Sequence, residues 1–311
     1  MDLCLMIEGQ EGVTWRQWQA LALACERHSI PALFRSDHYL DSVHPERGSL
    51  DAWGTLNALA AVTSTLRLGT MVSPATFRHP STLAKLVTTA DQISGGRIEL
   101  GLGAGWNERE HAAYGFPFPD VRTRMDLLEE QLQVVLGNWS DGPFSFQGDH
   151  YHLHDLDAEP KPVQRPHPPL IMGGNAGLRS CALAARFADE YNTVYPTVSD
   201  ARERRERVVA ACERVGREPI PFSIMTAVIA GADESDLQDR VRRVARVRWD
   251  GPDEMLAERP PGWVIGVVEQ VAEQLSALRE AGVSRVICQH LAPDDLDFVA
   301  LLGGELAQLV A

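Results

Sequence analysis

Cysteine and lysine are scarce in this sequence, and long apolar runs are missing, which narrows the class of protein. The five cysteines show neither paired spacing nor a CxxC motif; they are Cys4, Cys25, Cys181, Cys212 and Cys288. This usage favours buried thiols in a reducing compartment over a disulfide framework. No stretch approaches the ~20 consecutive apolar residues of a transmembrane helix, and Met1 leads directly into a strand-like run rather than a signal peptide. We therefore expect a soluble, cytoplasmic protein with no membrane partner.

Positive charge is also in short supply. The formal net charge is −14, and Lys85 and Lys161 are the two lysines. The arginines are scattered, and the run Arg202–Arg207 is interleaved with Glu203 and Glu206, which predicts a salt-bridged helix surface. Such a charge pattern argues against nucleic acid or an anionic membrane as the main partner.

The most regular pattern in the chain lies within residues 66–111. Two short apolar runs, Leu66–Val72 and Arg97–Gly103, flank a segment, Ser81–Ile93, whose apolar residues fall at helical spacing. Ser81 is the expected N-cap, and Ser94-Gly95-Gly96 is expected to end the helix. The unit reads as strand, helix, strand, which joins parallel neighbours by a right-handed crossover.

The same rhythm extends along the whole chain. The predicted strands are Leu3–Ile7, Pro31–Phe34, Leu66–Val72, Arg97–Gly103, Pro169–Met172, Tyr191–Tyr195, Phe222–Ala230 and Arg285–Gln289. The predicted helices are Trp15–Arg27, Trp53–Val62, Ser81–Ile93, Val121–Trp139, Leu178–Ala188, Asp200–Gly216, Asp233–Arg248, Val267–Ala281 and Asp294–Val310. Strands alternating with helices over this length predict one α/β domain, residues 1–311, folded as a (β/α)8 TIM barrel rather than a doubly wound sheet. Residues 140–168 break the rhythm and predict an inserted hairpin or loop that covers part of the barrel mouth.

In such barrels the active site lies at the carboxyl ends of the strands. His38 follows the second strand and suits proton transfer, because an imidazole titrates near neutral pH. Asp37 is the second catalytic candidate, although adjacent residues of an extended segment point in opposite directions. The alternative is that Asp37 caps the next helix and His38 is a hydrogen-bonded rim residue.

Two further patterns bear on ligands. Gly173-Gly174-Asn175-Ala176-Gly177 lies between a strand and a helix, where exposed backbone N–H groups suit a phosphate, although a tight turn is the alternative. Glu108, Glu110 and His111 have a spacing that could suit metal ligands. The sequence has no second cluster of such residues to complete a metal site. The alternating residues His150, His152 and His154 favour a solvated polar strand face over zinc. No metal is therefore predicted.

Several motifs together resemble the luciferase-like monooxygenase superfamily, and within it the actinobacterial branch that uses the deazaflavin coenzyme F420. They are SDHY at 36–39, RLGTMVSPATFRHPSTLAK at 67–85, DQISGGRIELGLGAGWNEREHAAYG at 91–115, PKPVQRPHPPLIMGG at 160–174, LAARFADEYN at 183–192 and LREAGVSRVICQ at 278–289. They run in order over most of the chain.

The resemblance implies a bacterial luciferase-like barrel that holds a flavin or deazaflavin at the strand ends. It implies a non-proline cis peptide bond that contacts the central ring of the cofactor. The expected position is Met71–Val72, and Val72–Ser73 is the less favoured alternative. Phosphate contacts map to the Gly173-Gly174 loop, with Asn175, and to Thr193. His38 maps near the hydride-transferring face, Gly103 ends the fourth strand beside the cofactor, and Asn107 or its neighbours reach the cofactor side chain. Relatives usually dimerise, so a homodimer is expected.

The fourth-strand loop departs from the family pattern. Trp106 stands where some sugar-phosphate dehydrogenase relatives carry an acidic residue, so the proton donor stays open among His38, Glu108 and Glu110. With two lysines, a phosphate clamp must use arginine and backbone N–H groups, and an arginine patch within 240–248 is expected to receive a polyglutamate tail.

The predicted function is hydride transfer between coenzyme F420 and a small organic substrate. The alternative is an FMN-dependent luciferase-like monooxygenase. A cofactor-binding sensor without turnover and a metal-dependent hydrolase barrel are less favoured classes.

Overall fold

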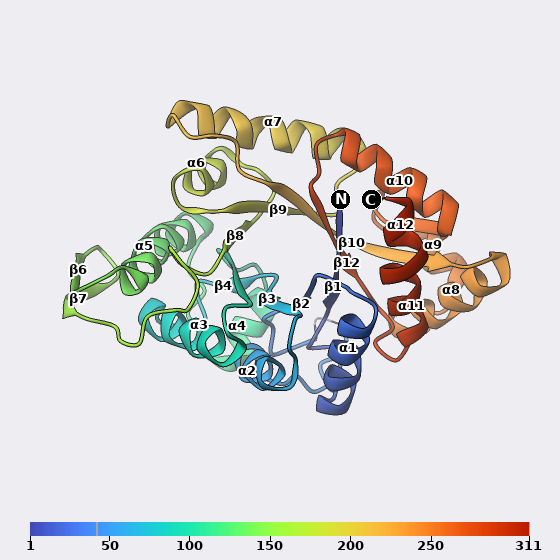
Figure 1. The fold of residues 1–311 in the computed structure, drawn as a ribbon, viewed down its shortest axis with the longest axis horizontal. Coiled ribbons are helices and arrows are strands. Elements are labelled where there is room, and N and C mark those ends of the chain that lie inside the picture. Colours follow the sequence, from blue (N-terminus) through green and yellow to red (C-terminus); the bar gives the residue numbers. More distant parts are fainter. Residues whose placement is uncertain (42, 311) are drawn as a thin grey trace.

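The computed structural model describes residues 1–41 and 43–310, and its centre is a closed barrel of eight parallel strands (Figure 1). Around the barrel the order is β10, β12, β1, β2, β3, β5, β8 and β9, and pairing of β9 with β10 closes the ring. The strands are β1 (Asp2–Ile7), β2 (Ala32–Arg35), β3 (Arg67–Thr70) with its continuation β4 (Ser73–Pro74), β5 (Ile98–Gly103), β8 (Leu170–Gly173), β9 (Glu190–Val194), β10 (Phe222–Gly231) and β12 (Arg285–Gln289). The predicted TIM-barrel fold is confirmed.

Helices surround this ring. They are α1 (Trp15–Arg27), α2 (Ala52–Val62), α3 (Pro80–Ser94), α4 (Glu108–Tyr114), α5 (Val121–Trp139), α6 (Leu178–Phe187), α7 (Val198–Arg214), α8 (Glu234–Arg248), α9 (Pro252–Glu258), α10 (Val268–Glu280), α11 (Leu296–Leu301) and α12 (Ala307–Leu309), with a π-helical turn, Leu302–Leu306, between the last two. Within the described part of the chain, no helix has the length and apolar character needed to cross a membrane.

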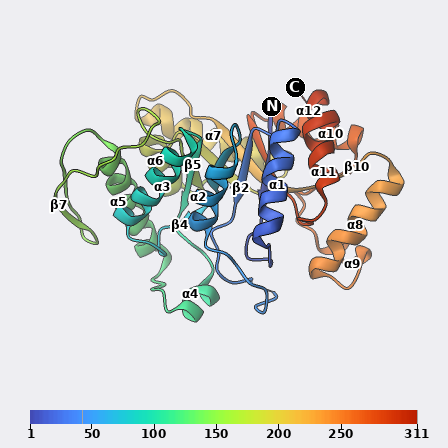
Figure 2. The same ribbon diagram turned by 60° about the horizontal axis from the view of Figure 1, so that its bottom comes forward.

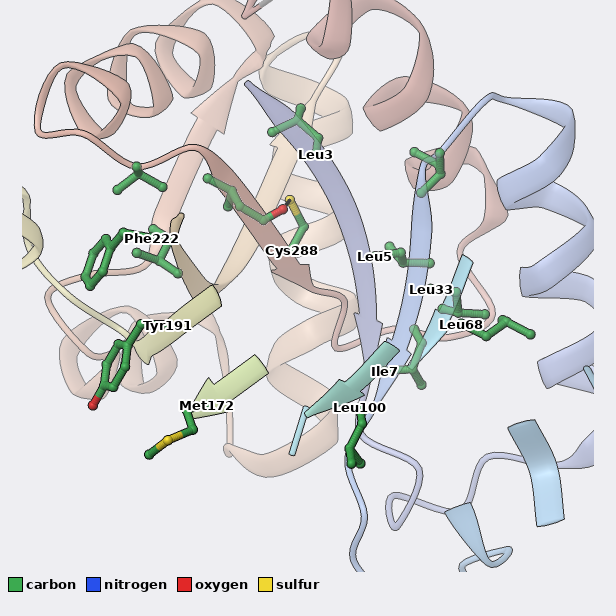
Figure 3. Close-up of a cluster of buried hydrophobic side chains, with 14 of the residues drawn as sticks. Leu3, Leu5, Ile7, Leu33, Leu68, Leu100, Met172, Tyr191, Phe222 and Cys288 are labelled. Atoms are coloured by element: carbon green, nitrogen blue, oxygen red, sulfur yellow. Dashed lines mark hydrogen bonds between the residues drawn. The ribbon is translucent and has the colours of Figure 1, made fainter. Parts of the chain in front are cut away.

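Alternation along the strands divides the core into two layers. Leu3, Leu5 and Ile7 of β1 face the surrounding helices, together with Leu33 and Leu100 of neighbouring strands (Figure 3). The residues between them face inward, since successive strand side chains point to opposite faces. Cys4, Met6, Phe34, Ile171, Met225 and Ile287 accordingly form a separate cluster in the barrel interior.

A buried ion cluster fills the amino-terminal end of the barrel. Arg285 of β12 contacts Glu99 of β5 at 2.9 Å and Glu190 of β9 at 2.6 Å, and Arg67 contacts Glu99 at 2.6 Å. Burial acts to raise the pKa of Glu99, but the two arginines outweigh it and lower that pKa. Paired charges therefore stabilise the amino-terminal end of the barrel. The candidate active site lies at the opposite end, at the carboxyl ends of the strands.

The structure corrects four local predictions. Helix α3 begins at Pro80 with His79, not Ser81, as its N-cap. A short strand, β11 (Val264–Val267), pairs with the end of β10, and the helix α9 lies between the predicted helices Asp233–Arg248 and Val267–Ala281, where no element was predicted. The predicted terminal helix Asp294–Val310 begins at Leu296 and passes through the π-helical turn.

Residues 140–168 do contain a hairpin, made of β6 (Phe144–Gln147) and β7 (His152–Leu156). Its turn is fastened to α5, because Glu130 accepts hydrogen bonds from the backbone N–H groups of Asp149, His150 and Tyr151. Figures 1 and 2 show the hairpin on the outer flank beside α5. The hydrogen bonds to Glu130 hold the hairpin turn to α5, and the cover over part of the barrel mouth stays a prediction.

Candidate active site

The floor of the barrel mouth is apolar. Met71, Ile171 and Met225 belong to the inner cluster, with Val72 packed against it. The peptide bond Met71–Val72 is cis, which confirms the expectation from the resemblance. Val72 occupies space left by glycines: an added Cβ at Gly103 or Gly173 would lie 2.8 or 2.9 Å from a Val72 methyl carbon.

Beside this floor, His38 is paired with Glu110. The Glu110 side chain is fully buried, the His38 side chain is 16% exposed, and the His38 Nδ1 lies 2.7 Å from the Glu110 Oε2. The other oxygen, Oε1, accepts hydrogen bonds from the backbone N–H groups of Tyr39 and Leu40. One carboxylate therefore fixes both the imidazole and the loop that carries it.

The electrostatics of this pair favour a charged imidazole. Burial acts to lower the pKa of His38, but the hydrogen bond and charge of Glu110, with the charges of Glu8 and Asp37, outweigh burial and raise that pKa. Because an ionised carboxylate can only accept, Nδ1 carries a proton and Nε2 lies on the opposite side of the ring. The arrangement can deliver a proton from Nε2 and restore it from solvent.

Asp37 faces a different set of partners, as expected for a neighbour in an extended segment. Arg78 donates to it at 2.5 and 3.1 Å, and the Ser73 hydroxyl donates at 2.6 Å. Arg78 also donates to Asp51 at 2.7 Å. Asp37 thus joins the loops after β2 and β3 and contributes to His38 by its charge.

A second polar wall crosses the mouth from β1 to β9. Glu8 accepts hydrogen bonds from Gln289 at 2.5 Å and from Gln10 at 2.8 Å. The Tyr195 hydroxyl donates to Gln289 at 2.7 Å. Sequence reasoning placed Tyr195 and Gln289 at strand ends but missed Glu8, although its position directly after the first strand was the available signal.

The glycine loop after β8 and the start of α6 form a cradle, in which the backbone N–H groups of Gly174 and Ala176 are already bound, the first to the Asn192 carbonyl at 3.0 Å. The Tyr191 hydroxyl accepts from the backbone N–H of Ala176 at 2.8 Å and lies 2.5 Å from the Ser180 hydroxyl. An added Cβ at Gly174 would lie 2.8 Å from that hydroxyl, so the close approach requires glycine. Helix α6 then starts after Gly177 without a side-chain cap, which leaves its first N–H groups to other acceptors.

A cation lies next to this cradle. Arg204 of α7 donates to the hydroxyl of the buried Thr193 at 2.6 Å, and its charge opposes the rise in the Tyr191 pKa that burial causes. Uncapped helix N–H groups beside a guanidinium fit a phosphate. The sequence predicted that Arg204 lies on a salt-bridged helix surface. In the same run, Arg202–Arg207, Arg207 does form such a salt bridge, with Glu203.

Other predicted residues have different roles in the structure. Asn107 caps α4 by accepting from the Glu110 N–H at 3.3 Å, and Asn175 is exposed in the glycine loop. Within the expected arginine patch at 240–248, Arg240 and Arg243 both contact Asp295.

Histidines also lie directly after β12 and in the hairpin region. Burial lowers the pKa of His290, after β12, to about 3, and its Nε2 lies 3.1 Å from the Asp295 carbonyl oxygen. His290 is therefore neutral at pH 7. His150, His152 and His154 lie in the hairpin region, and the described residues contain no group of three or more potential metal ligands.

Comparison with known proteins gives the site a context. The model for a family described as luciferase-like monooxygenase matches residues 4–285. An FMNH2-dependent dimethylsulfone monooxygenase of Pseudomonas putida is 27% identical over 76% of this chain and 72% of its own length. An F420-dependent glucose-6-phosphate dehydrogenase of Kineococcus radiotolerans is 24% identical over 93% of this chain and 91% of its own length. The solved coenzyme F420-dependent tetrahydromethanopterin reductase of Methanopyrus kandleri superposes with a TM-score of 0.82 over the full length of both chains at 20% identity.

Proposed function

Because the chain belongs to the luciferase-like monooxygenase family, whose members use F420 or a flavin, we propose that it transfers a hydride between coenzyme F420 and a small organic substrate. The observation that carries this choice is the His38–Glu110 pair, 2.7 Å apart at the barrel mouth. Reduction of a carbonyl or related group by hydride needs a proton at the same place and time. An imidazole whose pKa is raised by a buried carboxylate can supply it.

The residues of the mouth fit such a cofactor. The apolar floor at Met71 and Val72 provides a contact for a planar ring, Ser73 follows it with its hydroxyl bound to Asp37, and Gly103 lets Val72 pack closely into the floor. The loop at Gly173, Gly174 and Asn175 leads into the uncapped start of α6, whose N–H groups would hold a phosphate beside Thr193 and the positive charge of Arg204. When bound, a deazaflavin supplies the hydride; the protein orients it and excludes water from the floor.

In this proposal His38 is the catalytic residue. Its Nε2 donates a proton to the atom that becomes negatively charged, or accepts one in the reverse direction. Glu110 positions the ring, keeps Nδ1 protonated and stabilises the imidazolium. Asp37 adds negative charge through its place beside the ring, and Asn107 sets the start of the helix that carries Glu110.

The test is a pair of titrations of the purified protein, with coenzyme F420 and with FMN. We expect micromolar or tighter binding of the deazaflavin, and loss of most hydride transfer in His38→Ala with little change in cofactor affinity. Preference for FMN together with oxygen uptake in the presence of reduced flavin would instead assign the protein to the monooxygenase alternative.

We further propose that the enzyme works as a homodimer in the cytoplasm. The resemblance supports the dimer, and all five cysteines are free and buried, as in proteins of a reducing compartment. Light scattering on the purified protein tests the dimer, and a mass near 34.3 kDa, that of one chain, would refute it.

A further inference from the structure

We propose that the substrate is an uncharged carbonyl compound, or the corresponding alcohol, whose apolar planar body lies against Trp106. This inference rests on the proposed hydride transfer and defines its substrate class. It also predicts that phosphorylated and carboxylated substrates are rejected.

The first observation is the position of Trp106. It follows β5 in the loop that leads to α4, and its ring stands edge-on to the His38 ring with centroids 5.5 Å apart and planes at 77°. The residue is 67% exposed, although an indole is among the side chains that gain most from burial. A large aromatic surface is thus held open next to the proton donor. A planar apolar body placed there covers the indole and brings its polar end to His38.

The second observation is the balance of charge around the mouth. The guanidinium of Arg78 is bound to Asp37 and Asp51, and that of Arg35 is buried against Thr55 and the carbonyl of Leu50. These positive charges are therefore already committed to the protein itself.

The acidic groups at the mouth are held differently. Glu8 is held by two amide side chains, and Glu110 by an imidazole and two backbone N–H groups. The charges of both carboxylates act to raise the pKa of His38. The charged imidazole of His38 offsets Glu110, so Glu8, which is held by neutral amide groups, is the carboxylate that an anionic substrate would meet in this partly desolvated space, where charge repulsion is costly.

The reaction balances with the groups named. The reduced deazaflavin gives a hydride to the carbonyl carbon, and the electron pair of the C=O π bond moves to oxygen. That oxygen takes the proton from His38 Nε2 as the N–H bond breaks, so the carbonyl becomes an alcohol and the cofactor is oxidised. The neutral imidazole is then protonated again by water. Alcohol oxidation is the same sequence in reverse.

The experiment compares acetophenone with 4-acetylbenzoate, which has the same body and an added carboxylate. With the F420-loaded enzyme we expect kcat/KM for acetophenone to exceed that for 4-acetylbenzoate by at least ~10-fold, with the gap shrinking at high salt. Glucose 6-phosphate should give no turnover. Equal rates for the two ketones, or preference for the acid, would overturn the charge argument.

Variants of Trp106 test the aromatic contact. Trp106→Ala should raise KM for acetophenone by about 10-fold with a smaller effect on kcat, and Trp106→Phe should recover most of that loss. Val121→Ala is the matched control, because it removes another exposed apolar side chain, at the start of α5. An unchanged KM in Trp106→Ala would overturn the role of the indole.

A binding measurement without turnover separates this inference from the proposed function. Saturation-transfer difference NMR of acetophenone should show contact with the wild type that is lost in Trp106→Ala and kept in Val121→Ala. If F420 binds but acetophenone shows no Trp106-dependent contact, the substrate class is wrong and the proposed function stands. If F420 does not bind, the proposed function fails on its own measurement.

Discussion

Replacing Glu110 by glutamine isolates the effect of one charge on His38. Glutamine has nearly the same shape, so its amide oxygen can still accept from the N–H groups of Tyr39 and Leu40. Its NH2 group then faces Nδ1 and forces the proton of the neutral ring to Nε2. Hydrogen bonds to charged groups contribute about 1.5–3 kcal/mol, and 1.36 kcal/mol corresponds to roughly one pKa unit. We therefore expect the His38 pKa to fall by about 1–2 units in Glu110→Gln, because burial then acts with less opposition.

The assay is an NMR titration of histidine-labelled protein, with the His38 resonance assigned from the spectrum of His38→Gln. The matched control is Glu108→Gln, which removes an exposed carboxylate from the same first turn of α4. The reasoning is refuted if the His38 pKa falls by less than ~0.3 units, or if Glu108→Gln lowers it equally, since the Coulomb energy at 2.7 Å is far larger than at an exposed position.

The same variant changes two pH profiles. Carbonyl reduction needs the imidazolium, so kcat/KM should fall as pH rises through the His38 pKa, and this fall should move to lower pH by about 1–2 units in Glu110→Gln. For stability, a raised folded-state pKa contributes free energy that is present below the unfolded value near 6.5 and is lost as pH rises through the folded value. The stability difference between wild type and Glu110→Gln should therefore shrink across that window, which denaturant unfolding at several pH values measures.

Three further changes test other parts of the molecule. Gly173→Ala places a Cβ 2.9 Å from a Val72 methyl, so we expect a loss of about 1–3 kcal/mol in the free energy of unfolding by denaturant melts; an unchanged stability would contradict the close packing. Arg204→Met should weaken F420 binding by about 10-fold or more in fluorescence titrations while sparing the His38 pKa, and equal affinity would remove Arg204 from the phosphate site. Arg285→Met leaves Glu99 and Glu190 without their shared cation, so unfolding should cost about 3–5 kcal/mol less, against almost no change for the exposed Arg242→Met.

The barrel was predictable because its signals are local. Short apolar runs, each followed by a segment with a helical pattern, repeat along the chain and fix the class. The errors also have local causes. His79 caps α3 by a side-chain nitrogen 3.2 Å from the Ser81 N–H, a role that serine fills more often. Strand β11 was missed because Val264–Val267 is only four residues long and runs directly into the helix Val268–Glu280, so its end could not be told from the start of the predicted helix Val267–Ala281.

The site was predicted in its parts and not in its pairings. His38 and Glu110 were both candidates, but the contact between them spans 72 positions in sequence, and no periodicity reports on such a separation. The contact of Arg204 was not predicted for a related reason. Arg204 belongs to a salt-bridged run but donates to Thr193, whereas Arg207 of the same run pairs with Glu203 on the surface. Tertiary packing, not residue type, separates these two arginines.

The two ends of the described chain meet on one side of the barrel. The Met1 ammonium donates to the carbonyl of Val310 at 3.4 Å, and Figure 1 shows both ends together. A short linker could therefore join them, and new ends could be opened in the turn at 148–150, which is exposed on the hairpin. Strands and helices would then be made by the ribosome in a different order, while every contact of His38 and Glu110 could still form. A circularly permuted chain could therefore begin in the hairpin, and the barrel could be tethered to a support through that side.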